Sequence, residues 1–158
     1  MNFYQLKFEQ KIPASIDKVW QFIASPHNLS LITPPSMGFK VITEGYYSTM
    51  YEGMIIGYSV SPLLGLKLKW LTEITHVKPY EYFVDEQKSG PYKIWHHQHT
   101  IEAINGGVLM KDLLTYVPPF GIVGTLANNI FIKKKLEKIF DYRFQAIENC
   151  FGKWHSEK

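Results

Sequence analysis

The sequence is short of cysteine, of concentrated charge and of long apolar runs. It has one cysteine, Cys150, in 158 residues, which excludes an internal disulfide framework and favours a reducing compartment. The formal net charge is +3, too small and too dispersed to indicate a nucleic-acid-binding surface. No apolar run approaches the length of a membrane span, and the first residues lack the apolar core of a signal peptide. We therefore expect a cytoplasmic protein with no nucleic-acid partner and no stable membrane insertion.

Aromatic residues, by contrast, are plentiful. Ten Tyr, ten Phe and four Trp make up 15% of the chain, and apolar residues as a whole make up 46%. A chain of this length fits one domain with a sizeable core, so we expect residues 1–158 to form a single domain. The aromatic side chains are numerous enough to line a large cavity as well as to fill a core.

The first forty residues predict one strand followed by two short helices. Residues 2–12 alternate between apolar and polar side chains, which is typical of a half-buried strand. One helix is expected to begin at Ser15, a favoured N-cap residue, and a second at Ser25, which precedes a proline at the first helical position. The Thr33-Pro34-Pro35 segment ends the second helix.

The next forty residues predict three further strands. These are expected over residues 39–44, 53–60 and 66–78. Gly57 interrupts the second of them, where a bulge or a close backbone approach is expected. Residues 61–65 form a predicted turn, and on the long strand that follows Trp70 shares a face with Leu68.

Residues 83–116 predict three consecutive strands, joined by turns at 88–91 and at Asn105-Gly106-Gly107. Asn-Gly between two alternating runs is the strongest short signal of a hairpin, and its two-residue loop places Ile104 opposite Gly107. Counting back from this turn pairs His99 with Asp112, His97 with Leu114, and Trp95 with Tyr116.

Opposite residues of a hairpin share a face of the sheet. One face is therefore mostly apolar and aromatic but holds two histidines and a carboxylate: Trp95, His97, His99, Ile101, Met110, Asp112, Leu114 and Tyr116. The other face is polar and expected in water: His96, Gln98, Thr100, Glu102, Lys111 and Thr115. Asp85 and Gln87 share a face with Phe83, but the pattern does not decide whether that face is concave.

Residues 122–151 predict one long helix. Apolar residues recur there at spacings of three and four: Ile122, Leu126, Ile130, Leu136, Ile139, Phe140, Phe144, Ile147 and Phe151. At 1.5 Å per residue such a helix spans about 40 Å, enough to cross a sheet. The expected fold is therefore α+β: a curved antiparallel sheet of about seven strands wrapped around a long C-terminal helix, with two short helices after the first strand.

This order of elements resembles the helix-grip fold of the SRPBCC or START-like superfamily, which includes polyketide cyclases and dehydratases and lipid-transfer proteins. The closer similarity is to bacterial ligand-binding SRPBCC proteins, and it extends over the whole chain. It is carried by Phe83-Val84-Asp85-Glu86-Gln87, Gly90-Pro91-Tyr92, Trp95-x-His97-x-His99, Met110-x-Asp112 with Tyr116, Pro119-Phe120-Gly121 and Phe140-Asp141-Tyr142-Arg143. The sequence departs from the pattern at Ile101, where an aromatic residue is expected, and at Pro118. The resemblance implies a cavity for a small hydrophobic or amphipathic molecule and no cofactor. It implies no single reaction, because the fold hosts both binders and enzymes.

Several interpretations of the two histidines and the aspartate on the predicted apolar face stay open. In the first, the protein binds or transports a small hydrophobic or amphipathic molecule. The ligand-binding set is then Trp70, Trp95, His97, His99, Met110, Asp112, Leu114 and Tyr116. In the second, His99 bonds to Asp112 in a buried network that merely holds two strands in register. In the third, His97, His99 and Asp112 bind zinc or iron, but one short spacing is weak support, and no metal is expected.

Two further classes also remain. A His–Asp pair in an apolar pocket suits a general base for cyclisation, dehydration or isomerisation, although the chain shows no nucleophile motif and we assign no catalytic residue. The protein could instead be an interaction module with an incidental cavity. Residues 133–135, all lysines, and Leu63-Leu64 at a turn would allow a transient membrane contact, although a solvated helix face and an ordinary hairpin end are the simpler explanations. The pattern leaves the oligomeric state and the ligand open.

Overall fold

The computed structural model describes residues 2–43, 49–63 and 66–155. Its elements run in this order: β1 (Tyr4–Ile12), α1 (Ile16–Ile23), the 3₁₀ helices η1 (Pro26–Ser30) and η2 (Pro35–Met37), β2 (Lys40–Val41), β3 (Ile55–Leu63), β4 (Leu66–Lys78), β5 (Tyr82–Ser89), β6 (Ile94–Ile104), β7 (Gly107–Val117), α2 (Gly121–Ala127), the π-helical η3 (Asn128–Ile132) and α3 (Lys133–Phe151). Within these residues, seven strands form one antiparallel sheet in the order β1-β7-β6-β5-β4-β3-β2. The α+β fold class predicted from the sequence is confirmed.

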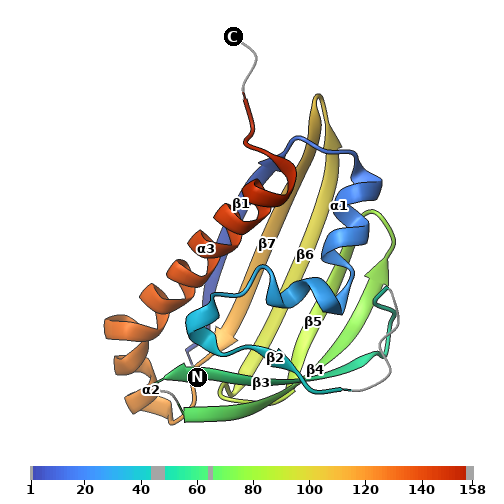
Figure 1. Cartoon of the computed structure of the whole chain (residues 1–158). Coiled ribbons are helices and arrows are strands. Elements are labelled where there is room, and N and C mark those ends of the chain that lie inside the picture. The colour runs from blue at the N-terminus through green and yellow to red at the C-terminus, as the bar shows by residue number, and fades with distance from the viewer. Residues whose placement is uncertain (1, 44–48, 64–65, 156–158) are drawn as a thin grey trace.

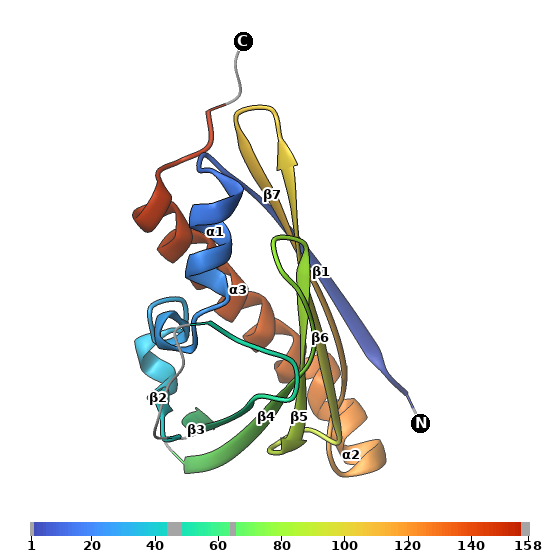
Figure 2. The ribbon, with the colours of Figure 1, turned by 90° about the vertical axis from the view of Figure 1, so that its right-hand side faces the viewer.

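The sheet curls around its helices. The C-terminal helix lies diagonally across the sheet, and α1 lies over the end near the β6–β7 turn (Figure 1). In the view turned by 90°, α1 and α3 lie on the same side of the sheet, and β3 and β2 bend towards that side (Figure 2). No helix among the described residues is long and apolar enough to cross a membrane.

The register of the β6–β7 hairpin is the predicted one. Ile104 lies opposite Gly107, His99 opposite Asp112, and Trp95 opposite Tyr116. Gly106 has a φ of 83°, the left-handed conformation that a tight two-residue turn requires and that glycine adopts without strain. The turn thereby fixes which side chains of both strands face the helix.

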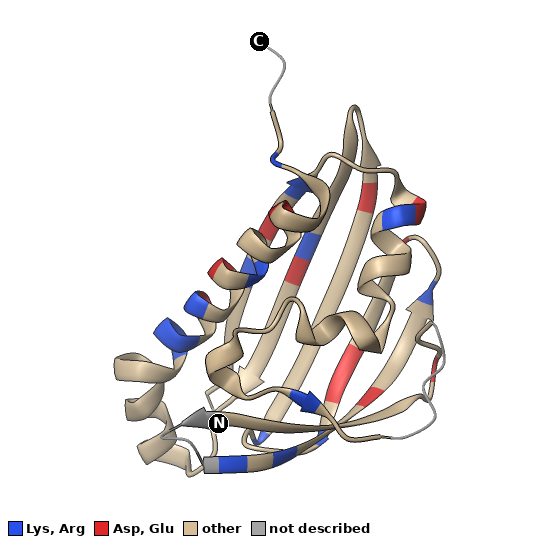
Figure 3. Ribbon diagram, viewed as in Figure 1, with Lys and Arg blue, Asp and Glu red and all other residues tan. Residues whose placement is uncertain are grey.

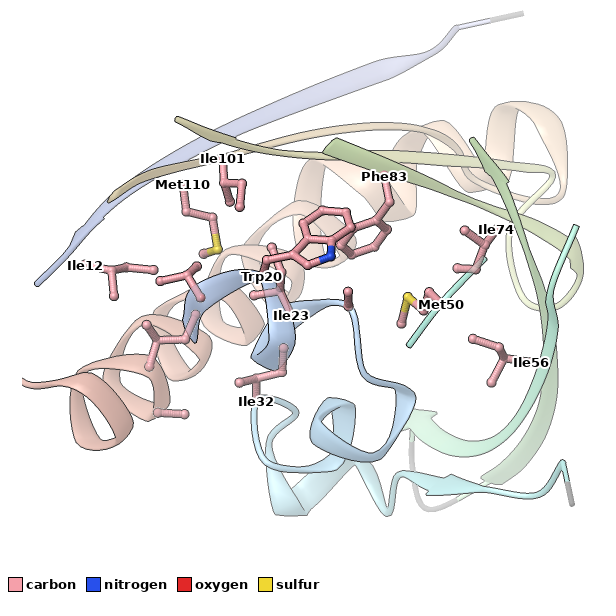
Figure 4. Packing of buried hydrophobic residues seen from close by; sticks show 14 of the residues in the cluster. Ile12, Trp20, Ile23, Ile32, Met50, Ile56, Ile74, Phe83, Ile101 and Met110 are labelled. Atoms are coloured by element: carbon pink, nitrogen blue, oxygen red, sulfur yellow. The ribbon is translucent and has the colours of Figure 1, made fainter. Parts of the chain in front are cut away.

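The core lies between the sheet and the helices. Trp20 of α1 packs edge-on to Phe83 of β5, with ring centroids 6.3 Å apart, and Figure 4 shows both rings among the aliphatic side chains of the strands. A second cluster lies under α3, where Phe140 stacks on Phe8 of β1 at 3.9 Å. Each fully buried side chain of this kind stabilises the fold by about 1.5–3 kcal/mol. The first cluster packs α1 against the sheet, and the second packs α3 against it.

Three predicted boundaries differ from the structure. Only Lys40–Val41 of the predicted strand 39–44 is a strand, and Glu44 lies outside the described residues. β3 continues to Leu63, so the predicted turn over 61–65 is partly strand, and Leu64 and Gly65 lie outside the described residues. The second predicted helix is a 3₁₀ helix of five residues, because the prolines at 34 and 35 leave it no room for α-helical turns.

The predicted apolar stripe of the last helix also needs correction. Its C-terminal members Leu136, Phe140 and Ile147 are buried against the sheet. Ile122 and Ile130 are instead exposed, by 82% and 74% of their surface. The reason is that α2 and η3 extend past the strands (Figure 1), so the sheet does not cover that part of the stripe.

Candidate functional site

A cavity of about 630 Å³ lies between the concave face of the sheet and α3. Strands β3 to β6 contribute one wall, α3 and η3 the opposite one, and the segment around η1 and η2 closes a third side. Most of the lining side chains are apolar or aromatic. The cavity exists because the bulky residues of α1 and α3 fill the two ends of the groove and leave the middle open.

Four of the predicted ligand-binding residues line this cavity. They are Trp70, Trp95, His97 and His99. Trp70 and Trp95 meet edge to face at 4.9 Å and form the aromatic part of the wall. Whether a ligand contacts these four residues stays a prediction.

The other four predicted residues lie on the expected face but not in the cavity wall. Met110, Leu114 and Tyr116 are 0% exposed, and Asp112 is 2% exposed. All four belong to β7: Leu114 and Tyr116 pack with Leu136 and Phe140, and Met110 belongs to the cluster that contains Ala146 and Ile147. Tyr116 has a structural partner, because its hydroxyl donates a hydrogen bond to Oδ1 of Asn128 at 2.7 Å. Of the eight residues predicted to bind a ligand, only Trp70, Trp95, His97 and His99 line the cavity, and their contact with a ligand stays a prediction.

The polar part of the site is a cluster of five side chains from four elements. It consists of Asp85 (β5), His97 and His99 (β6), Asp112 (β7) and Arg143 (α3). The predicted pair is present: Nδ1 of His99 lies 2.9 Å from Oδ1 of Asp112. The same carboxylate oxygen accepts a hydrogen bond from Nε2 of His97 at 3.0 Å. On the other side of the rings, Nε2 of His99 donates to Oδ2 of Asp85 at 2.7 Å.

Arg143 completes the cluster from the helix. Its Nη1 lies 3.5 Å from Oδ1 of Asp112, and its Nη2 lies 3.3 Å from Nδ1 of His99. Within the described residues, Oδ2 of Asp112 and Nε of Arg143 are buried without a hydrogen-bond partner. Arg143 also lines the cavity, so its remaining hydrogen-bonding capacity is available on that side.

The protonation states follow from the partners. A carboxylate oxygen only accepts, so a ring nitrogen that hydrogen-bonds to one must carry a proton. Nε2 of His99 therefore carries a proton towards Asp85, and Nδ1 of the same ring lies close to both Oδ1 of Asp112 and Nη2 of Arg143. Burial disfavours a charged ring, but the interactions with Asp112 and Asp85 outweigh burial and raise the pKa of His99. For His97, burial and the neighbouring His99 charge lower the pKa, so this ring is neutral, with its proton on Nε2.

The two carboxylates are ionised despite their burial. Burial alone would raise the pKa of Asp112, but the charge of Arg143 and the hydrogen bonds from both histidines hold it well below its usual range. Burial likewise opposes ionisation of Asp85, and the hydrogen bond from His99, with the electrostatic influence of the two histidine rings, lowers the pKa of that carboxyl. Arg143 and the hydrogen bonds from the histidines thus compensate the two buried carboxylates.

Sequence reasoning missed two members of the cluster. A signal for Arg143 was present, since it stands between Phe140 and Ile147 at the spacing of the buried stripe, where an arginine needs a partner. The placement of Asp85 depends on the β5–β6 register, which pairs it with His97. Gln87, also left undecided, is structural: its side chain donates to the carbonyl of Tyr92 at 2.6 Å and accepts from the Tyr92 N–H at 3.2 Å.

No protein-family model matches the sequence, and no curated protein does. Solved structures are similar over nearly their whole length. Protein CV1439 from Chromobacterium violaceum has a TM-score of 0.71 at 10% identity, covering 94% of this chain and 96% of that one. Ginseng major latex-like protein 151 from Panax ginseng has a TM-score of 0.68 at 13% identity, covering 94% and 97%. Ara h 8.0201 has a TM-score of 0.62 at 13% identity, covering 94% and 99%.

Structural similarity at identities this low establishes the fold but leaves the activity open. The sheet order, the long C-terminal helix and the short helices after the first strand are the features that these structures share with this chain. The chain therefore has the helix-grip fold that its sequence predicts.

Proposed function

We propose that this protein binds a small hydrophobic or amphipathic molecule in the cavity between the sheet and α3. The observation that carries the proposal is the wall itself: about 630 Å³ of space bounded mainly by apolar and aromatic side chains, with one polar cluster set into it. Small-molecule sites are typically cavities of ~300–1,000 Å³ built in this way, with a few polar groups that orient the ligand.

The polar cluster defines how an amphipathic ligand lies. An apolar body fits against Trp70 and Trp95, and a polar end fits against Asp85, His99 and Arg143, which line the same cavity. A buried polar group without a partner costs roughly 1–3 kcal/mol, so a ligand that turned its polar end to the aromatic wall would bind more weakly. Asp112 acts from behind, by holding the two histidines in place.

Native mass spectrometry and a binding probe test the proposal together. Protein purified under non-denaturing conditions should retain a small molecule, or take up the hydrophobic fluorophore anilinonaphthalene sulfonate in a one-to-one complex. Ile139→Trp adds bulk inside the cavity and should weaken probe binding at least about tenfold, since strain of ~1–3 kcal/mol is added on occupancy. Ile94→Trp is the matched control, because Ile94 is partly exposed and lies outside the cavity wall. Equal probe affinity in both variants would refute a ligand site here.

The cavity also bears on the two other classes considered from the sequence. An interaction module with an incidental cavity predicts a pocket too small for a ligand, and about 630 Å³ argues against that. A cyclase-like or dehydratase-like enzyme would use the same cavity with His97 and Asp112 as its base pair. His97→Gln separates binding from catalysis, because an enzyme should lose turnover, whereas binding of a hydrophobic probe depends mainly on the apolar wall around Trp70 and Trp95 and should fall only slightly.

A further inference from the structure

The histidines and Asp85 are arranged around a common point in the cavity wall. Oδ2 of Asp85 lies 2.7 Å from Nε2 of His99 and 3.6 Å from Nδ1 of His97, and the donor atoms of the three residues all lie within 4.8 Å of one another. Around a metal ion with bonds of about 2.0–2.2 Å, donor atoms lie roughly 3–3.5 Å apart. We propose that Asp85, His97 and His99 form a binding site for a divalent first-row transition metal ion.

The second observation is the way the outer nitrogens of both rings are held. Nε2 of His97 and Nδ1 of His99 both bond to the same oxygen of Asp112, at 3.0 and 2.9 Å. Metal-binding histidines usually donate their other ring N–H to a carboxylate, which fixes the ring and raises its basicity. Both histidine donors are thus positioned by a further residue.

One contact in the cluster is unfavourable until a cation occupies it. Because Nε2 of His97 carries the proton towards Asp112, Nδ1 presents a lone pair to Oδ2 of Asp85 across 3.6 Å. Two acceptors that face each other gain nothing, whereas a metal ion between them bonds to both. The third donor, Nε2 of His99, must lose the proton that it donates to Asp85 before it can bind the metal.

The donor set and its position indicate the kind of metal site. Two imidazoles and one carboxylate suit zinc, ferrous iron or cobalt rather than magnesium or calcium, which prefer oxygen donors alone. All three residues line the cavity, so the remaining coordination positions open onto it. Sites with three protein ligands and an open position bind an oxygen donor of a ligand or water, unlike closed structural sites. The positive charge of the metal ion favours an anionic donor such as a carboxylate or an enolate.

Metal titrations of the protein, freed of metal by a chelator and of any affinity tag, test this site. Wild-type protein should bind one equivalent of Zn²⁺ in calorimetry and develop the visible absorption of low-symmetry Co²⁺ when Co²⁺ is the probe. Asp85→Asn keeps an oxygen that accepts from His99 but loses the anionic ligand, so it should bind Zn²⁺ at least about 100-fold more weakly. Glu86→Gln is the matched control, since Glu86 is the next residue and pairs with His96 on the outer face.

The outcomes decide the proposal. Retained binding in Glu86→Gln with loss in Asp85→Asn, both variants melting as folded proteins by circular dichroism, supports the site. Loss in Glu86→Gln alone would place the metal on the outer Glu86–His96 pair and refute the proposal. Wild-type protein that binds neither Zn²⁺ nor Co²⁺ would refute it as well. Because this test uses metal ions without any hydrophobic probe, it can fail while the proposed ligand binding holds, and the reverse.

A different observation concerns the outer surface of α2 and η3. Six large apolar side chains are exposed there and form what we term the apolar end of the helix: Phe120, Ile122, Val123, Leu126, Ile130 and Phe131. Positions 122, 126 and 130 are four residues apart and share one helix face. Exposed apolar side chains gathered in this way mark an interaction surface.

Positive charge predominates next to the apolar end, where, among the described residues, Glu137 pairs with Lys133 alone at 3.8 Å. The chain has no acidic residue between Asp112 and Glu137, whereas Lys133, Lys134 and Lys135 follow the apolar end directly. Figure 3 shows the start of α3 in blue and no red on α2. Phe120 and Phe131 also line the cavity, so the apolar end borders it. We infer that the apolar end docks on a lipid bilayer that contains anionic lipids, where apolar side chains enter the interface and the lysines meet the headgroups.

Vesicle flotation tests this second inference. Wild-type protein should float with vesicles of phosphatidylcholine and phosphatidylglycerol, and more weakly with phosphatidylcholine alone. Leu126→Asp with Ile130→Asp should abolish flotation, and each Lys→Glu change at 133 or 134 should weaken it at least about fivefold. Leu71→Asp is the control, since Leu71 is an exposed leucine on β4. Wild-type protein that stays unbound to anionic vesicles would overturn the inference. So would light scattering that shows a dimer dissociated by the Asp pair, because a second copy would then cover this surface.

Discussion

Replacing Asp112 by Asn tests the physical account of the polar cluster most directly. Oδ1 of Asp112 receives Nε2 of His97 and Nδ1 of His99 and faces Arg143 at 3.5 Å. Breaking a buried ion pair by removing one partner costs ~3–5 kcal/mol. Because Asn keeps one oxygen that accepts, we expect the lower end, a loss of about 3 kcal/mol in the free energy of unfolding. For a chain of this size that corresponds to a fall in Tm of about 6–12 °C.

Urea titration followed by tryptophan fluorescence measures this loss, with a chelator present so that no metal contributes. Glu86→Gln is the comparison, because Glu86 bonds to His96 at 2.7 Å with both side chains about one-third exposed. Such surface pairs contribute only about 0–1 kcal/mol. If Asp112→Asn costs no more than Glu86→Gln, the charge of Asp112 does not hold the cluster together, and our account of it is wrong.

The pH dependence of the same two proteins gives an independent check. Burial alone would raise the folded-state pKa of Asp112, but Arg143 and the two histidines hold it well below its usual range. The stabilisation it provides is therefore complete above the unfolded pKa of about 3.9 and is lost as pH falls through the folded value. The difference in unfolding free energy between wild type and Asp112→Asn should be independent of pH near neutrality and should shrink in acid. A difference that stays constant down to about pH 2 would contradict the lowered pKa.

Three further changes have defined outcomes. His99 has a raised pKa, so its stabilising charge is complete below about pH 6.5 and lost as pH rises through the folded value; the stability difference between wild type and His99→Gln should therefore shrink in alkaline urea titrations. Tyr116→Phe leaves the buried Oδ1 of Asn128 without its donor and should lower the unfolding free energy by about 1–3 kcal/mol in the same assay, with unchanged circular dichroism. Gly107→Ala would drive a methyl group into the carbonyl oxygen of Ile12 and should cost about 1–3 kcal/mol, visible as a lower Tm.

Local sequence patterns were sufficient to predict the half of the site that lies on β6 and β7. The Asn105-Gly106 turn fixes the register, and the register fixes that His99 meets Asp112 and that both side chains face the helix. Alternation also sorted the exposed residues of β1 from the buried ones. These inferences held because each depends on residues close in sequence or joined by one tight turn.

The rest depends on distances that no local pattern encodes. Asp85 reaches the cluster through the β5–β6 pairing, whose connecting segment around Ser89-Gly90-Pro91 has no turn signal that specifies a register. Arg143 reaches it because α3 crosses β6 at that turn of the helix, 44 residues from His99. Which face residues border the cavity was equally hidden, because periodicity places a side chain on a face and does not say what the helix covers. The exposure of Ile122 and Ile130 is the clearest example, since the same spacing continues past the end of the sheet.

The pairing of β1 with β7 affects how this protein folds while it is being synthesised on the ribosome. Gln5 bonds to Thr115, a partner 110 residues later in the chain. At a synthesis rate of about 5–20 residues per second, the first strand must wait roughly 5–20 s for its neighbour. During that interval its inward face has no sheet to join, so an emerging chain offers chaperones an early apolar segment.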